Sequence, residues 1–227
     1  MLDFTRFEVL TFDCYGTLID WEAGILSALR RILSAHNKQI DDATLLKLYG
    51  DFELRSEEGA FHPYRQVLES VVRQFAAELR FTPTPDEVHS LPDSLSAWKP
   101  WPDTVAALRQ LKTRFRLAIL SNVDDDLLSS TLSHFTVRFD LLITAQQVRS
   151  YKPALRHFHT ARERIGKNRR WLHAAQSFFH DIVPAHALGI PVAWVNRKEQ
   201  ARQPDISPDM EVKTLGGLAD RLDRFGA

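Results

Sequence analysis

The stretch LTFDCYGTLIDWE, residues 10–22, decides the fold. It places Asp13 at the end of an apolar run, FEVLTFD at 7–13, whose β-branched and aromatic residues predict a buried strand. An aspartate is costly to bury unless its carboxylate is paired or hydrogen-bonded. We therefore expect Asp13 either to be solvated at the tip of this strand or to be held there for chemistry.

The composition excludes several classes of function. Of the 227 residues, 44% are hydrophobic and 26% are charged, which is typical of a soluble globular protein. Lys plus Arg equals Asp plus Glu, 29 each, so bulk charge gives no basis for a nucleic-acid or acidic-membrane partner. The single cysteine, Cys14, excludes an intrachain disulfide, and neither a signal-peptide pattern nor a membrane-length apolar run is present. We expect a cytoplasmic protein.

Two kinds of pattern divide the chain. After the first strand, helical periodicity runs through 23–36, 42–58 and 63–80, and a proline-rich connection with a short helix follows at 81–100. Beyond it, strands and helices alternate. Strands are predicted at 116–122, 139–145, 171–177, 192–196 and 210–215, and helices at 103–113, 124–134, 153–165, 182–188 and 216–225.

Alternation of this kind predicts an α/β fold, with a Rossmann-like parallel sheet covered by helices on both faces. The all-helical block lies between the first strand and the others. We therefore expect a core domain formed by residues 1–18 and 97–227, interrupted by an inserted helical domain at 19–96.

Polar residues follow four of the predicted strands. Asp13 ends the first; Ser121 and Asn122 end the second; Lys152 follows the third; and His180 and Asp181 follow the fourth. Ligands of open parallel sheets bind outside the carboxyl ends of the strands. These side chains are therefore expected to meet in one cleft.

The segments FDCYGT, ILSN, YKP and HD with ALGIP resemble, in order and spacing, the four motifs of the haloacid dehalogenase superfamily. The resemblance implies that Asp13 is a nucleophile, that Lys152 holds its carboxylate and that Ser121 binds substrate. It also implies that the fourth motif supplies further acid groups and that the helical block is a cap over the site.

Tyr15 separates the branches of this superfamily. The phosphatase members carry a second aspartate at this position, which protonates a poor alkoxide leaving group, whereas a halide leaves without an acid. The DxYGT pattern is similar to that of the L-2-haloacid dehalogenases. Ser177 also stands where a metal-binding aspartate of the fourth motif belongs. We therefore expect no metal and no cofactor.

The resemblance implies a hydrolytic dehalogenase that converts short (S)-2-haloacids to (R)-2-hydroxyacids through an ester on Asp13. Asp181 is the expected base for the water that cleaves the ester, with His180 a second candidate. The substrate carboxylate is expected to be held by Ser121, Asn122 and the backbone around residues 15–17, namely Tyr15, Gly16 and Thr17.

The sequence departs from the family pattern at three places. Phe178 replaces an asparagine of the fourth motif, and Phe158 replaces a tyrosine that some members carry after the lysine. The arginine that assists halide departure has no unique match. The candidates for it are Arg30, Arg31, Arg55 and Arg65. An apolar pocket is expected from Trp21, Phe61, His62 and Tyr64.

Two other functions stay open. One is a Mg²⁺-dependent phosphatase of a small phosphorylated metabolite, against which Tyr15 and Ser177 weigh. The other is a non-catalytic binding protein that has kept the fold. A homodimer is compatible with the helical block, but the pattern defines no interface.

Overall fold

A six-stranded sheet forms the centre of the molecule, in the order β3-β2-β1-β4-β5-β6. The computed structural model describes residues 4–166, 169–201 and 204–224, so the ends of the predicted core domain and residue 225 of its last helix lie outside the described residues. Every neighbouring pair of strands is parallel. The strands are β1 (Val9–Phe12), β2 (Arg116–Ser121), β3 (Leu141–Thr144), β4 (Trp171–Ala175), β5 (Val192–Val195) and β6 (Met210–Val212). The predicted Rossmann-like α/β fold is confirmed.

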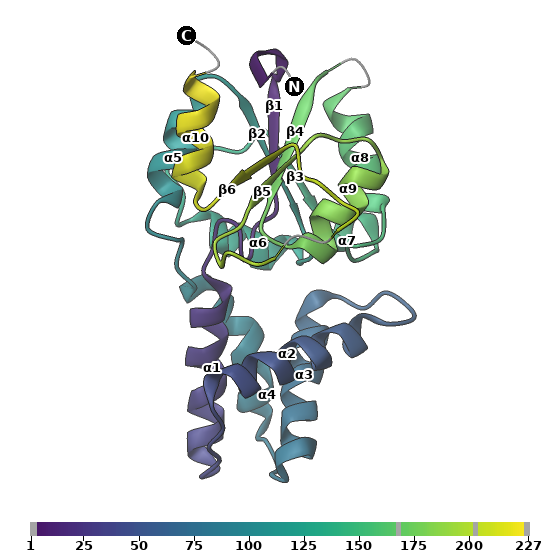
Figure 1. Cartoon of the computed structure of the whole chain (residues 1–227). Helices are drawn as coiled ribbons and strands as arrows, with labels where there is room; N and C mark the ends of the chain where they lie inside the picture. The colour runs from purple at the N-terminus through teal and green to yellow at the C-terminus, as the bar shows by residue number, and fades with distance from the viewer. Residues whose placement is uncertain (1–3, 167–168, 202–203, 225–227) are drawn as a thin grey trace.

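Helices cover both faces of the sheet, as a parallel sheet requires. Figure 1 shows α5 (Thr104–Lys112) and α10 (Leu215–Arg224) on one face, and α8 (Arg156–Ile165) and α9 (Val183–Ala187) on the other. The burial of all four residues of β1 explains why this strand reads as a continuous apolar run.

Three short helical segments complete this part of the chain, besides α6 (Asp125–Leu132). They are η1 (Phe4–Arg6), α7 (Ala145–Val148) and a single π-helical turn, η3 (Phe178–Ile182). The sequence predicted none of the three, because such short segments show no measurable periodicity.

Four helices between β1 and α5 form a separate layer below the carboxyl-terminal edge of the sheet (Figure 1). This helical layer consists of α1 (Trp21–Ala35), α2 (Asp42–Glu57), α3 (Tyr64–Leu79) and α4 (Pro85–Ser94), followed by the turn η2 (Leu95–Ala97). Asp20 begins α1 by accepting a hydrogen bond from the amide of Ala23, and Thr84 and Glu87 form a capping box at α4. The domain limits at 19 and 96 stay a prediction. Of the helices in the described part of the chain, none is both long and apolar enough to cross a membrane.

The start of α3 is bound to the core by Asp124, which follows β2. Its two carboxylate oxygens accept hydrogen bonds from the amides of Tyr64 and Arg65, each at 2.9 Å. Amides in the first turn of a helix have no partner within the helix, so this carboxylate satisfies two of them at once. Tyr151 adds a second tie, because its hydroxyl donates to the carbonyl of His62 at 2.7 Å. These contacts hold the start of α3 against the strand ends.

We predict that Asp124→Ala lowers the free energy of unfolding by about 1–2 kcal/mol, because it leaves two first-turn amides of α3 without an acceptor. Urea denaturation followed by circular dichroism measures the change. Asp51→Ala is the control, since it removes only an exposed ion pair with Lys47 and is expected to shift stability by no more than about 0.5 kcal/mol. Equal effects of the two substitutions would contradict the anchoring role of Asp124.

Candidate active site

Asp13 lies at the carboxyl end of β1, in the middle of the sheet. Its amide donates to the carbonyl of Ala174 on β4 at 3.2 Å, which continues the strand pairing through this residue. The carboxylate is nearly buried and accepts two hydrogen bonds. One oxygen accepts from the Lys152 ammonium and the other from the Thr17 hydroxyl, each at 2.9 Å. Asp13 is therefore held by two donors, as a buried carboxylate requires.

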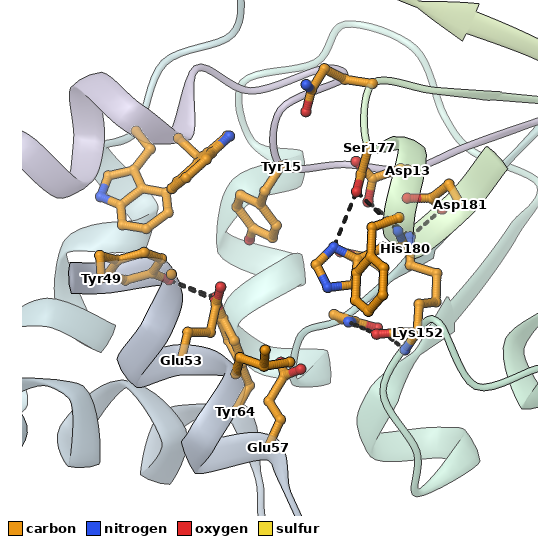
Figure 2. Close-up of a pocket in the computed structure, with 18 residues that line it drawn as sticks. Asp13, Tyr15, Tyr49, Glu53, Glu57, Tyr64, Lys152, Ser177, His180 and Asp181 are labelled. Carbon is orange, nitrogen blue, oxygen red and sulfur yellow. Dashed lines mark hydrogen bonds and ion pairs between the residues drawn. The ribbon is translucent and has the colours of Figure 1, made fainter. Parts of the chain in front are cut away.

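The ammonium of Lys152 joins three strand ends. It donates to Asp13 at 2.9 Å, to Asp181 at 2.6 Å and to the carbonyl of Leu120 on β2 at 2.9 Å. Its side chain is 1% exposed, so all three protons of the ammonium are directed to protein acceptors. Figure 2 shows Asp13, Lys152 and Asp181 together on the sheet side of the pocket. The residues that follow the four predicted strands all line one cavity, as expected; besides these three, they are Ser121, Asn122 and His180.

Asp181 is held by one oxygen and leaves the other without a partner. Its Oδ1 accepts from Lys152 and from Nε2 of His173 at 2.9 Å, while its buried Oδ2 has no hydrogen-bond partner among the described residues. Nδ1 of His173 lies 2.8 Å from the hydroxyl of Thr11 on β1. A carboxylate only accepts, so Nε2 carries the proton and donates it. Asp181 is one of the residues that line the cavity.

The pKa values of the two carboxylates, Asp13 and Asp181, are shifted in opposite directions. Burial raises the pKa of Asp13, and the charge of Asp181 raises it further against the opposing effect of Lys152. Burial also acts to raise the pKa of Asp181, but Lys152 and His173 outweigh it and lower that pKa to about 2. Asp181 is therefore ionised at neutral pH.

The side chains of Asn122 and Thr17, two residues predicted to bind substrate, make hydrogen bonds to Lys152 and Asp13. Asn122 is paired with the backbone of Lys152, whose amide donates to Oδ1 at 2.7 Å and whose carbonyl accepts from Nδ2 at 3.0 Å. Thr17 donates to Asp13 and accepts from the amide of Gln176 at 2.8 Å. Ser121 differs from both, because its buried hydroxyl has no hydrogen-bond partner in the described structure; the residue lines the same cavity as Asp181.

The remaining predicted residues of the first motif, Tyr15 and Gly16, lie next to Asp13 in the chain. Gly16 has φ +101°, and a Cβ atom there would lie 3.0 Å from the side-chain oxygen of Gln176. The Tyr15 hydroxyl lies 2.8 Å from that of Thr131 on α6, so this side chain is tied to the core. Its ring packs edge-on against Trp98 at 5.8 Å.

Ser177 and His180 form a local turn beside Asp181. The Ser177 hydroxyl accepts from the amide of His180 at 3.1 Å and lies 3.1 Å from Nδ1 of its ring (Figure 2). Burial lowers the pKa of His180, which is therefore neutral at neutral pH. His180 lines the cavity, but the group bonded to Asp181 is His173.

A cavity of about 310 Å³ lies between the strand ends and the helical layer. Of the four residues predicted to form an apolar pocket, Trp21 and Tyr64 line it. Phe61 instead stacks on Tyr151, with ring centroids 5.3 Å apart, and His62 contributes its carbonyl to the hydroxyl of Tyr151.

None of the four candidate arginines lines the cavity. Arg30 pairs with Asp42, Arg65 bridges two exposed aspartates, Arg55 lies over the ring of Phe52 and Arg31 is exposed on α1. The side of the cavity formed by the helical layer carries other polar groups. These are Tyr49, Glu53, Glu57 and Tyr64.

Sequence reasoning missed His173 and the two glutamates. His173 lies inside the predicted strand 171–177, where a lone histidine has no spacing that marks it as functional. Tyr49, Glu53 and Glu57 do repeat at intervals of four, which places them on one helical face. The sequence thus contains this spacing, but it does not indicate a site by itself, because polar residues on one face of a helix usually face solvent.

Comparisons with known proteins agree on the family. The matching family model, over residues 7–175, is that of the haloacid dehalogenase-like hydrolases. The chain is 30% identical over 222 residues to (S)-2-haloacid dehalogenase H-109 of Pseudomonas putida, covering 95% of this chain and 97% of that protein. It is 26% identical to haloacetate dehalogenase H-2 of Moraxella sp. (strain B), over 85% of this chain and 87% of that protein.

A solved structure has the same fold. The L-2-haloacid dehalogenase of Xanthobacter autotrophicus, with chloropropionic acid covalently bound, superimposes with a TM-score of 0.83 at 21% identity, covering 97% of this chain and all of that one (100%). The family model spans most of the chain, and the Pseudomonas putida protein matches it almost end to end. The chain therefore belongs to the haloacid dehalogenase-like hydrolases.

Proposed function

We propose that this protein is a hydrolytic dehalogenase of short 2-haloacids, which converts an (S)-2-haloacid and water to an (R)-2-hydroxyacid and halide. The observation that carries the proposal is the pairing of Asp13 with Asp181 through Lys152 in the lining of the cavity, with one oxygen of Asp181 left without a hydrogen-bond partner among the described residues. Relatives named as 2-haloacid dehalogenases support the choice of substrate.

In the first step, a carboxylate oxygen of Asp13 attacks the carbon that bears the halogen. A C–O bond forms as the carbon–halogen bond breaks, the halide leaves with the bonding electrons, and the carbon inverts. A halide needs no proton donor, which fits Tyr15 at the position two after the nucleophile. The helical layer acts as the cap that closes over this step.

In the second step, a water molecule gives a proton to the free oxygen of Asp181 and attacks the carbonyl carbon of the Asp13 ester. Lys152 stabilises the negative charge that develops on the tetrahedral intermediate. The acyl C–O bond then breaks, and the departing alkoxide takes the proton back from Asp181. The hydroxyl left on the Asp13 carboxyl group carries the second proton of the water, and its release to solvent restores the Asp13 carboxylate. The bond to the inverted carbon is not broken again, so the product keeps the inverted configuration.

Ser121 is the side chain we assign to the substrate carboxylate, because its buried hydroxyl needs a partner. The backbone at Tyr15, Gly16 and Thr17 contributes to the same subsite in this proposal, and Gly16 keeps side-chain atoms away from it. Asn122, Ser177 and His180 support the site through the contacts described above. The roles of these residues rest on their position around Asp13.

A metal-dependent phosphatase fits these residues less well. Asp13 and Asp181 each direct one oxygen to the ammonium of Lys152, and the other oxygen of Asp13 accepts from Thr17. Tyr15 and Ser177 add no carboxylate, and no group of three His, Cys, Asp or Glu side chains able to hold a metal occurs within the described ranges. We therefore propose a reaction without a metal. A non-catalytic role is disfavoured because three buried charges are expensive to keep in a purely structural cleft.

The proposal includes a cytoplasmic location and a small-molecule substrate as the main partner. A reducing compartment fits the one buried cysteine, Cys14, and a net charge of zero gives no attraction to nucleic acids or acidic membranes. A homodimer stays a prediction, which a molar-mass measurement by light scattering tests.

We predict halide release from (S)-2-chloropropionate that persists in EDTA and is lost in Asp13→Asn, because the amide is a poor nucleophile. Ion chromatography of the released halide measures it, with bromoacetate and fluoroacetate as further substrates. Para-nitrophenyl phosphate with Mg²⁺ serves as the parallel assay. Phosphate release that requires Mg²⁺, without any halide release, would establish the phosphatase alternative.

The pH dependence is predicted to show an acid limb set by Asp13, because only its ionised form attacks. The raised pKa of Asp13 places this limb above the ordinary aspartate value of about 3.9. Thr17→Val removes a hydrogen bond that favours the ionised form, so it should move the limb upward by roughly half to one pH unit. Profiles of kcat/KM between pH 4 and 8 measure the shift, and a downward shift would contradict the assignment.

His173 is predicted to position Asp181 for ester hydrolysis. In His173→Leu, the second step should slow by roughly tenfold to a hundredfold while the first continues, so the Asp13 ester accumulates. Mass spectrometry of the quenched enzyme detects the ester, and rapid-quench assays show a burst of halide. His173→Gln keeps an amide donor and should restore part of the rate, whereas His159→Leu, on the exposed side of α8, should have no effect. Loss of activity without ester accumulation would assign His173 a purely structural role.

A further inference from the structure

The face of α2 that looks onto the strand ends carries two carboxyl groups. Tyr49, Glu53 and Glu57 follow one another at intervals of four residues, so they form one stripe along the helix, and all three line the cavity. Figure 2 shows both glutamates across the cavity from Asp13, Lys152 and His180. We call Glu53 and Glu57 the acidic wall.

Glu53 is held in place by two tyrosines. Its Oε1 accepts from the hydroxyl of Tyr49 at 2.7 Å and from the hydroxyl of Tyr64 at 2.5 Å, and the two hydroxyls lie 3.1 Å apart. The arrangement joins α2 to α3 and orients one oxygen of the carboxylate. Hydroxyl donors of this kind satisfy a carboxylate without neutralising its charge.

Glu57 has neither a hydrogen bond nor an ion pair with any described residue, although it is only partly exposed. Burial raises the pKa of Glu57 to about 9, and the neighbouring charge of Glu53 adds to the effect. The other charged or titratable groups near it are Lys152 and Tyr151 after α7, Tyr64 on α3, and Asp13, His180 and Asp181 at the strand ends. The acidic wall thus lacks a counter-charge of its own.

The charges around the cavity are unbalanced. Its described lining contains four carboxyl groups and one ammonium, that of Lys152. This ammonium already bonds to both carboxylates on the sheet side, those of Asp13 and Asp181. No described arginine lines the cavity. With a pKa of about 9, Glu57 is protonated at neutral pH while no cation lies near it. An ammonium group placed against the acidic wall would favour the ionised form of Glu57 and pair with it, and the carboxyl oxygens of both glutamates can accept hydrogen bonds. The acidic wall therefore favours a hydrogen-bond donor or a cation and disfavours an alkyl group or an anion.

Two unpartnered atoms on the sheet side of the cavity are independent evidence for a ligand there. The hydroxyl of Ser121 and the Oδ2 atom of Asp181 are fully buried and have no partner among the described residues. Buried polar atoms are almost always hydrogen-bonded, so these two await a bound molecule or water. A ligand held there by its reacting end directs its other end toward the helical layer.

We infer that Glu53 and Glu57 select 2-haloacids whose substituent on the reacting carbon ends in an ammonium or a hydroxyl group, in preference to acids with a plain alkyl chain. The inference rests on the proposed function for the identity of the reacting end. The carboxylate and the halogen-bearing carbon lie on the sheet side, at Ser121 and Asp13. The donor group lies against the acidic wall, where the ammonium supplies the missing counter-charge.

Binding of halogen-free acids tests the selection without any turnover. Isothermal titration calorimetry compares 3-aminopropionate, 4-aminobutyrate and 5-aminopentanoate with butyrate, pentanoate and hexanoate, in which a methyl group replaces each ammonium. The hydroxy acids of the same lengths form the third series. We expect at least one amino acid of the series to bind about tenfold or more tightly than its methyl counterpart, with the hydroxy acid between them.

Glu57→Gln should abolish most of this preference, because the amide keeps the shape but cannot ionise to pair with the ammonium of the ligand. Glu53→Gln should reduce it as well, while its amide oxygen still accepts from the tyrosines. Glu58→Gln is the matched control: it removes a charge from the next residue, which is exposed and does not line the cavity, and should leave the preference unchanged. Equal binding of the three series, or a preference that Glu57→Gln and Glu53→Gln leave intact, would overturn the inference.

Turnover is measured separately, as halide release from (S)-2-chloro-4-aminobutanoate and from (S)-2-chloropentanoate. Faster release from the amino compound, with the difference lost in Glu57→Gln, supports the inference together with the proposed function. No halide from either compound, with the binding preference still present, would refute the dehalogenase proposal and leave the acidic wall as a donor-selective site. Equal release from both, with no binding preference, would refute the inference and retain the dehalogenase.

Discussion

The buried ammonium of Lys152 is the group on which the rest of the site depends. It lies between Asp13 and Asp181, with its side chain 1% exposed. Removing three charges from water is expensive, and the cost is offset only while each has its partners in place. The loss of any one would leave the others buried and uncompensated. The strand ends that carry them must therefore stay in register.

The order of the sheet provides that register. β1 lies between β2 and β4, so the residues that follow these three strands emerge side by side. Lys152 arrives from farther along the chain, after β3 and α7, and the pairing of its backbone with Asn122 fixes where its side chain begins. Asn122, which the sequence suggested for substrate binding, thus positions the charged side chain of Lys152. Thr17 does the same for Asp13, and His173 for Asp181.

The two sides of the cavity have different chemistry. The sheet side carries Asp13, Lys152 and Asp181. The side contributed by α2 and α3 carries glutamates and tyrosines, and none of the candidate arginines reaches it. Function in such a family resides in the site and not in the fold alone.

The helical layer also depends on the core for its position. Asp124 satisfies two amides at the start of α3, and the hydroxyl of Tyr151 reaches a carbonyl just before that helix. Both residues follow strands or short helices of the core. The distance between the acidic wall and Asp13 is thus set by contacts at the strand ends, close to the chemistry itself.

The sequence alone determined the alternation of strands and helices, the helical insertion and the place of Asp13 at a strand end, because these depend on local periodicity and on motifs that lie at strand ends. It placed Asp13, Lys152 and Asp181 in one cleft, since parallel strands end at a common edge. Only the tertiary structure showed that Asn122 bonds to the backbone of Lys152 and Thr17 to the carboxylate of Asp13, that His173 supports Asp181 and that Glu53 and Glu57 line the cavity. These facts depend on contacts between residues far apart in the chain. Which face of α2 is covered is decided by packing, and the periodicity of a polar stripe is the same whether it faces solvent or a binding site.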